Sequence, residues 1–165
     1  MEADLSFDRL KSLLRYDPES GQFTWLVRRG NRAAGAPANS VDGKGYIRVK
    51  IDGFDYRAHR LAWFYMHGVW PSDQIDHIDL VRKNNAFTNL REANNSFNGA
   101  NRRPASNNKS GFKGVMYDTK RKKWRAAIKK DGKERHLGRF ANKLDAISAY
   151  SVASAHYFGE FSRTN

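Results

Sequence analysis

The sequence predicts an α+β protein built from two domains. Asp52-Gly53 and Asp131-Gly132 each separate two strand-like segments, and Asp-Gly in that setting indicates a tight β-hairpin. Other segments carry apolar residues every three to four positions, which indicates helices. The charge is uneven: residues 1–101 carry 14 Lys and Arg against 12 Asp and Glu, and residues 102–165 carry 16 against 5. We therefore expect the two halves to have different tasks.

The bulk composition restricts the class of protein. The 165-residue chain has a formal net charge of +13, which favours an anionic partner, either nucleic acid or an acidic membrane surface. The chain has no cysteine, which excludes disulfides, cysteine zinc ribbons and thiol catalysis. No apolar run approaches the roughly 18 residues of a membrane-spanning helix, and the acidic N-terminus lacks a signal-peptide pattern. We expect a soluble protein without a membrane partner, in the cytoplasm of a bacterial or phage-infected host cell.

The N-terminal half is expected to combine short strands and helices. Before Asp52-Gly53, Ile47, Val49 and Ile51 fall on one face of a strand. An apolar helix follows this hairpin and ends at Gly68. The predicted elements, in order, are a helix over 5–14, strands over 22–27, 45–51 and 54–58, a helix over 59–67, a strand over 75–79, a loop over 80–88 and a helix over 94–101 capped by Asn94.

The C-terminal half is expected to be a small three-stranded antiparallel sheet packed on one helix. The segment before it contains Pro, Ser and Asn and almost nothing apolar, which marks a domain boundary. The predicted domains are residues 1–103 and 110–165, joined by a linker over 104–109. The predicted elements are strands over 111–116, 123–129 and 134–140 and a helix over 144–157 capped by Asn142.

Asp76 and His77 are the residues that most directly indicate chemistry. Hydrolysis of a phosphodiester needs a base for the attacking water and stabilisation of the charge on the leaving 3′-oxygen. A histidine can take the proton at neutral pH, and a hard divalent cation on oxygen ligands can stabilise the leaving group. Because neighbouring strand residues point to opposite faces, a bend or bulge is expected at this pair.

The surrounding pattern resembles the HNH endonuclease family, in its phage and intron-homing branch, whose members use a ββα-metal fold. The likeness covers most of residues 5–103 and rests on these motifs: Tyr56-Arg57-Ala58-His59-Arg60-Leu61-Ala62-Trp63, Asp76-His77-Ile78-Asp79, Asn84-Asn85, Asn89-Leu90 and Asn98. The resemblance implies that His77 is the general base and that Asn89 braces the loop and orients His77. It also implies that Asp76 and Asn98 hold the metal.

The last motif position departs from the family, because many members have a histidine where this chain has Asn98. The pattern is therefore H-N-N, with Asn94, Asn95 and Asn101 as rivals for the role of Asn98. An amide oxygen binds magnesium or manganese but is a poorer ligand for softer metals. We expect a divalent metal, Mg²⁺ first and Mn²⁺ as the alternative, with water and phosphate oxygens completing its ligands.

Neighbouring polar residues have structural explanations. Asp79 is expected to hydrogen-bond the loop in preference to binding metal. Asn84 and Asn85 are expected to shape the turn, because asparagine tolerates left-handed backbone and bonds its own main chain. His59 is expected to buttress the site, and His67 to interact with the dipole at the end of its helix.

The second half resembles the DNA-binding domain of plant ethylene-response factors, of the Apetala type, versions of which occur beside HNH nucleases. The likeness rests on these motifs: Ser110-Gly111-Phe112-Lys113-Gly114-Val115, Trp124-Arg125-Ala126, His136-Leu137-Gly138-Arg139-Phe140 and Phe158-Gly159-Glu160-Phe161. It implies a three-stranded sheet that enters the DNA major groove, with the helix packed behind. Lys113, Met116 and Lys129 stand where the plant domain has base-reading arginines, so its target sequence does not carry over.

Alternation along residues 123–129 independently supports a basic surface that faces DNA. Ala126 and Ile128 fall on the face that packs against the helix, and Arg125 and Lys129 fall on the other, where they can meet phosphates or base edges. The expected DNA contacts are Lys113, Arg125, Lys129, Arg135 and His136, with Lys120, Arg121, Lys122 and Lys123 touching phosphate from a turn.

These features predict a metal-dependent endonuclease that hydrolyses phosphodiester bonds of double-stranded DNA. The alternatives are a catalytically inactive, sequence-specific DNA-binding regulator and an RNA-binding protein. The predicted site argues against the inactive regulator, and a sheet without obvious exposed aromatic pairs argues against single-stranded RNA. One active site per chain allows nicking by a monomer or double-strand cleavage by a homodimer.

Overall fold

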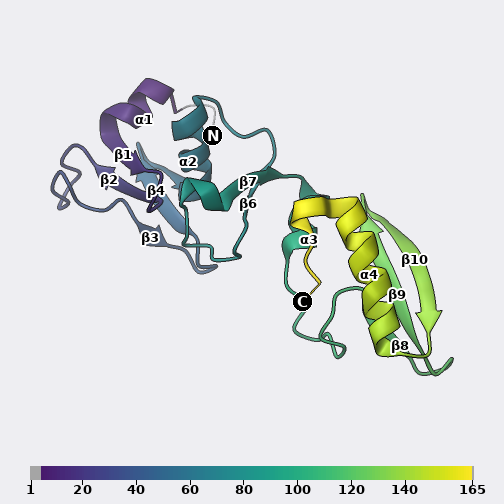
Figure 1. The fold of residues 1–165 in the computed structure, drawn as a ribbon. Helices are drawn as coiled ribbons and strands as arrows, with labels where there is room; N and C mark the ends of the chain where they lie inside the picture. The colour runs from purple at the N-terminus through teal and green to yellow at the C-terminus, as the bar shows by residue number, and fades with distance from the viewer. Residues whose placement is uncertain (1–4, 165) are drawn as a thin grey trace. The chain divides into compact units, whose positions relative to one another are not determined.

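The computed structural model describes residues 5–164, which divide into two compact units, one up to Glu92 and one from Ala93 on (Figure 1). Each unit combines helices with small antiparallel sheets and has its own hydrophobic core, so the predicted α+β class is confirmed. No helix within residues 5–164 is long and apolar enough to span a membrane.

The first unit contains two helices and three small sheets. The sheets pair β1 with β2, β4 with both β3 and β5, and β6 with β7. The elements are α1 (Phe7–Leu13), β1 (Leu14–Asp17), β2 (Gln22–Trp25), β3 (Ser40–Val41), β4 (Ile47–Ile51), β5 (Phe54–Arg57), α2 (Ala58–His67), β6 (Gln74–His77), the 3₁₀ turn η2 (Phe87–Asn89) and β7 (Leu90–Ala93).

Local sequence signals explain several of these boundaries. The β4–β5 hairpin turns at Asp52 and Gly53, both with positive φ (47° and 92°), as a two-residue turn of this kind requires. Helix α2 ends at Gly68 in the left-handed conformation. Strands β1, β3 and β7 were not predicted. The first residue of β1, Leu14, was assigned to the preceding helix over 5–14, and β3 has only two residues.

The core of the first unit joins both helices to the hairpin. Leu10, Leu14, Ile51 and Leu61 are fully buried, and each such side chain contributes about 1.5–3 kcal/mol by leaving water. Aromatic rings extend this core, and the ring of Trp70 stacks on that of Phe64 with 4.4 Å between centroids. Ala58, where α2 begins, and Ile75 of β6 belong to the same core.

The second unit is a three-stranded antiparallel sheet in the order β10-β9-β8, covered by a long helix (Figure 1). Asn142 caps that helix by accepting a hydrogen bond from the main chain of Leu144, as predicted. The elements are α3 (Asn95–Asn101), β8 (Val115–Asp118), β9 (Lys123–Lys130), β10 (Lys133–Phe140), α4 (Lys143–Phe158) and the 3₁₀ turn η3 (Gly159–Phe161).

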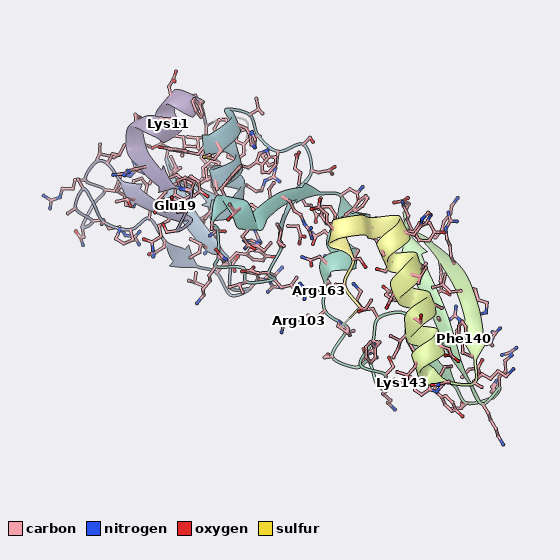
Figure 2. The ribbon with its side chains drawn as sticks, in the orientation of Figure 1. Lys11, Glu19, Arg103, Phe140, Lys143 and Arg163 are labelled. Carbon is pink, nitrogen blue, oxygen red and sulfur yellow. The ribbon has the colours of Figure 1, made fainter. Side chains whose placement is uncertain are left out.

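Helix α4 covers the face of the sheet that the sequence predicted. Ala126 and Ile128 are buried in one cluster with Tyr150 of α4. Figure 2 labels Phe140 and Lys143 where β10 leads into α4. The Lys143 ammonium lies 5.4 Å from the ring centre of Trp124, closing the end of this core.

The division between the units differs from the predicted linker over 104–109. Helix α3, which was assigned to the first domain, contributes Ala100 to the core of the second unit, and Phe97 packs against the same core. Asn94 caps α3 as predicted, accepting hydrogen bonds from the main chain of Ser96 and Phe97. By packing, the boundary therefore precedes α3, because its apolar side chains are buried with those of α4.

Candidate nuclease site and basic sheet

The end of β6 brings Asp76 and His77 into the interior side by side, each 5% exposed. The strand stops at His77, and the chain turns at once: the main-chain N–H of Leu80 donates to the carbonyl of His77 at 3.0 Å. Leu80 has φ +66°, a left-handed conformation that is rare for leucine. Strand alternation thus ends at this pair, so both polar side chains are buried.

The His77 ring is held by an amide and by two aromatic neighbours. Its Nε2 lies 3.0 Å from Oδ1 of Asn85. Because an amide oxygen can only accept, this contact assigns the ring proton to Nε2 and makes Nδ1 the basic nitrogen. The ring meets that of His59 edge-on at 5.0 Å and that of Tyr46 at 6.0 Å.

The electrostatic surroundings favour neutral imidazoles in this cluster. Burial lowers the pKa of His77, and the hydrogen bond to Asn85 and the charge of Asp79 oppose that shift. Burial, together with the nearby His77, lowers the pKa of His59 to about 3. A neutral His77 can accept a proton at physiological pH.

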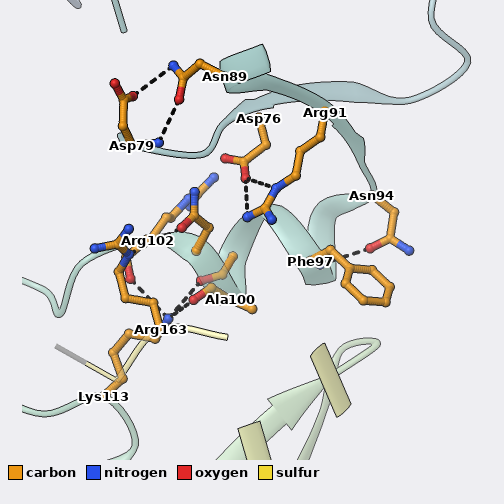
Figure 3. A network of polar contacts seen from close by, with 12 residues as sticks. Asp76, Asp79, Asn89, Arg91, Asn94, Phe97, Ala100, Arg102, Lys113 and Arg163 are labelled. Carbon is orange, nitrogen blue, oxygen red and sulfur yellow. Dashed lines mark hydrogen bonds and ion pairs between the residues drawn. The ribbon is translucent and has the colours of Figure 1, made fainter. Parts of the chain in front are cut away.

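Asn89 fixes the loop that follows His77. One side-chain N–H donates to Asp79 Oδ1 at 2.9 Å, and Oδ1 of Asn89 accepts from the main-chain N–H of Asp79 at 3.0 Å (Figure 3). The other side-chain N–H donates to the carbonyl of Asn84 at 2.8 Å. Asn84 in turn donates to Asp79 Oδ2 at 2.7 Å. The geometry gives Asp79 and Asn84 the loop-shaping contacts expected of them.

Asn85 is anchored through its main chain by two residues that the sequence did not single out. Tyr16 donates its hydroxyl hydrogen to the carbonyl of Asn85 at 2.7 Å. Gly21 has φ +72°, and a Cβ there would lie 2.1 Å from the carbonyl carbon of Asn85. Only glycine allows this approach, so β1 and the β1–β2 turn set the position of the amide that contacts His77.

Arg91 contacts Asp76, an interaction that was not predicted from the sequence. Its Nε and Nη2 both lie 3.1 Å from Oδ2 of Asp76, and both side chains are largely buried (Figure 3). A guanidinium holding one carboxylate oxygen orients the other. The only signal in the sequence is that Arg91 follows the Asn89-Leu90 motif.

The two predicted metal ligands lie in different units. Asp76 is on β6, whereas Asn98 is on α3, so their joint role stays a prediction. Within residues 5–164, no group of three His, Cys, Asp or Glu side chains is placed to hold a metal ion. The predicted donor set is one carboxylate and one amide, which would suit a hard cation with additional non-protein oxygen ligands.

The outer face of the β8–β10 sheet carries several of the predicted DNA contacts. Lys129 is exposed on this face, and Arg125 forms an ion pair with Glu134 there. Lys120, Arg121, Lys122 and Lys123 are exposed around the β8–β9 turn, as predicted. His136 pairs with Ala127 across the strands, and its Nε2 lies 3.3 Å from Nη1 of Arg139.

Arg135 does not lie on this outer face. It is the register partner of Ile128, and partners in an antiparallel pair share a face, so it lies on the side of α4. Its guanidinium carbon is 5.3 Å from the ring centre of Tyr157. A register shift between His136 and Gly138 brings Arg139 opposite Arg125 on the outer face, a position that simple alternation does not predict.

Lys113 also has a different environment from the one predicted. Its ammonium donates to the main-chain carbonyls of Ala100 and Arg102 near the end of α3, the latter at 3.0 Å (Figure 3). Burial lowers the pKa of Lys113 to about 8. Its contacts support α3, so we remove it from the set of proposed DNA-contacting residues.

The chain is similar to known HNH endonucleases. A family model described as HNH endonuclease matches residues 56–100. Protein 3.8 of Escherichia phage T7 is 32% identical over 108 residues, covering 65% of this chain and 88% of that protein. An uncharacterized HNH endonuclease of Acanthamoeba polyphaga mimivirus is 30% identical over 128 residues, covering 74% of this chain and 64% of that protein.

Among solved structures, the chain is similar to that of the HNH homing endonuclease I-HmuI, a protein that binds and cleaves DNA. The two share 20% sequence identity with a TM-score of 0.44, over 59% of this chain and 55% of that one.

Proposed function

The chain belongs to the HNH endonuclease family, and from that premise we propose that it is a metal-dependent nuclease of double-stranded DNA with His77 as general base. One observation carries the proposal. A buried imidazole with a lowered pKa is held by Asn85, on a loop that Asn89 fixes through three hydrogen bonds. A positioned base of this kind accelerates proton transfer by typically 10²–10⁴-fold.

The proposed reaction is hydrolysis of one phosphodiester bond. Nδ1 of His77 takes a proton from a water molecule, whose oxygen forms a bond to phosphorus while the bond from phosphorus to the 3′-oxygen breaks. The leaving 3′-oxygen then acquires a proton, which gives a 3′-hydroxyl and a 5′-phosphate. Asn85 keeps the Nε2 proton in place, so that Nδ1 remains the acceptor.

The residues proposed to hold the divalent metal are Asp76 and Asn98. Carboxylate and amide oxygens suit Mg²⁺, or Mn²⁺ as the alternative. The ion pair with Arg91 on Oδ2 supports this role by orienting the carboxylate of Asp76. When bound, such a cation stabilises negative charge on the leaving oxygen.

We further propose that the second unit binds DNA through the outer face of its sheet, as its resemblance to ethylene-response-factor domains suggests. Lys129, Arg125, His136 and Arg139 lie on this face, and the β8–β9 turn adds four basic residues. Asp118 and Glu134 each pair with an arginine there, which leaves the face positive overall. Phosphate contacts of this kind position a protein on DNA without reading its sequence.

The test is conversion of supercoiled plasmid to open circle or linear DNA with Mg²⁺, beside EDTA. We expect cleavage by the wild type and by His67→Ala, which removes an exposed histidine from the same region. We expect no cleavage by His77→Ala, although this variant should still bind DNA.

Open circle would indicate nicking by a monomer, and linear product at first turnover would indicate a homodimer. Equal cleavage by His77→Ala would contradict the assigned base, and tight binding without cleavage by the wild type would support a DNA-binding regulator.

A further inference from the structure

Arg82 lies in the loop between β6 and β7, and two contacts fix its side chain. Its Nη1 donates to the carbonyl of Lys44 at 2.6 Å. Its guanidinium carbon lies 5.0 Å from the ring centre of Tyr46, within the range of a cation–π contact. The side chain is nevertheless exposed. A long, flexible cation is therefore held at one place on the surface.

The turn that receives Arg82 is itself rigid. Oδ1 of Asp42 accepts hydrogen bonds from the main-chain N–H groups of Lys44 at 2.8 Å and Tyr46 at 2.9 Å. The main-chain N–H of Gly45 donates to the carbonyl of Asp42 at 2.9 Å. Both partners of Arg82 thus belong to one hydrogen-bonded turn, so its guanidinium is positioned before any ligand arrives.

This turn places Arg82 beside His77. The same Tyr46 ring that contacts the guanidinium lies 6.0 Å from the imidazole of His77. The loop that carries Arg82 is the one that Asp79 and Asn89 hold in shape.

The guanidinium of Arg82 has no acidic partner in the part of the chain that the structure describes, since no carboxylate there lies within ion-pair distance of it. Arg57 contacts the same Tyr46 ring at 4.3 Å, but Asp42 lies 3.7 Å from its guanidinium. A guanidinium has five N–H donors, and Lys44 uses one. The remaining N–H groups can donate to two oxygens of one anionic group, such as a phosphate.

We propose that Arg82 binds a backbone phosphate of the DNA strand that enters the His77 site. This role rests on the proposed nuclease function. It adds Arg82, a residue of the first unit, to the residues that contact the DNA substrate. A strand presented to His77 must carry its phosphates past Tyr46, because that ring adjoins the imidazole. Arg82 then fixes the register of the strand, so that the attacked phosphorus lies opposite the base.

The experiment measures DNA affinity against salt concentration in EDTA, where no cleavage occurs. The variants are Arg82→Gln, Arg82→Lys and, as a matched control, Arg15→Gln, which removes an exposed arginine on β1. We expect Arg82→Gln to bind about 10-fold more weakly at low salt. Its slope of log K against log salt should fall by about 0.9, the value for one lost phosphate contact. Arg82→Lys should keep most of that slope, and Arg15→Gln should match the wild type.

An unchanged slope for Arg82→Gln, or an equal loss for Arg15→Gln, would overturn the proposal. Because Arg82 is exposed, we expect its variants to keep the wild-type unfolding midpoint. An unchanged midpoint would exclude misfolding as the cause of weaker DNA binding. The result is separate from the test of nuclease activity. A wild type that cuts no DNA, with the slope change confined to Arg82→Gln, would refute the nuclease function and still support the phosphate contact.

Discussion

Acid should destabilise the first unit through His59. This side chain is 5% exposed, faces the rings of His77 and Tyr46, and its Nδ1 has no hydrogen-bond partner within residues 5–164. A buried imidazole without a partner for its charged form resists protonation, and burial lowers its pKa to about 3. In the unfolded chain the same group recovers its ordinary pKa of about 6.5.

The magnitude follows from proton linkage. Between the two pKa values the unfolded state binds a proton that the folded state does not, so the free energy of unfolding falls as the pH falls. The limiting slope is about 1.4 kcal/mol per pH unit. For a shift of this size, the loss between pH 7 and pH 5 is about 2 kcal/mol. That is a large part of the 5–15 kcal/mol of a typical domain.

The assay isolates the first unit by fluorescence. A Trp124→Phe background leaves Trp25, Trp63 and Trp70, which all lie in the first unit. Urea unfolding at pH 7, 6 and 5 should show a smaller pH dependence for His59→Gln than for the unsubstituted background, by about 2 kcal/mol over this range. His67→Gln, an exposed histidine on the same helix, is the control. Parallel pH profiles for the background and His59→Gln would refute this account of His59.

Three further substitutions test the supports around the site. Gly21→Ala should destabilise the first unit by more than about 1 kcal/mol in urea unfolding, because its new Cβ would overlap the main chain of Asn85; an unchanged midpoint would contradict the contact. Asn89→Ala should lower the single-turnover cleavage rate about 10-fold or more by releasing the loop at Asp79, and a wild-type rate would remove Asn89 from the site. Lys113→Met should destabilise the second unit by about 1–2 kcal/mol and leave the salt dependence of DNA binding unchanged; a lower slope would restore Lys113 as a DNA contact.

Local signals in the sequence predicted several elements of the fold and one feature of the site. The hairpin at Asp52-Gly53 and the cap at Asn142 depend on backbone conformations and hydrogen bonds within a few residues, and such features are written in short segments. The loop role of Asp79 was also predictable, because its partners lie within ten residues.

Contacts between distant segments could not be predicted in the same way. The ion pair of Arg91 with Asp76 and the support of Asn85 by Gly21 join residues on different strands, so they depend on sheet pairing that no single segment specifies. The environment of Lys113 likewise depends on the packing of α3 with the second unit. Only this packing brings the carbonyls of Ala100 and Arg102 to the Lys113 ammonium.

The register shift in β10 shows how one residue changes a predicted surface. Regular alternation already places Arg135 and His136 on opposite faces, with Arg135 opposite Ile128 and His136 opposite Ala127, so both cannot lie on the outer face. The shift between His136 and Gly138 then moves Arg139 to the outer face opposite Arg125. A bulge is a property of the strand pair, so the sequence of one strand does not reveal it.

The proposed nuclease function depends on His77 as the base. The most direct measurement is the single-turnover rate of plasmid cleavage with Mg²⁺ by the wild type and by His77→Gln, at enzyme concentrations that saturate DNA binding for both. We expect His77→Gln to lower the rate by at least about 100-fold, with DNA affinity unchanged. A variant rate within a few-fold of the wild type would contradict the proposed role of His77, because the buried imidazole would then have no part in the chemistry.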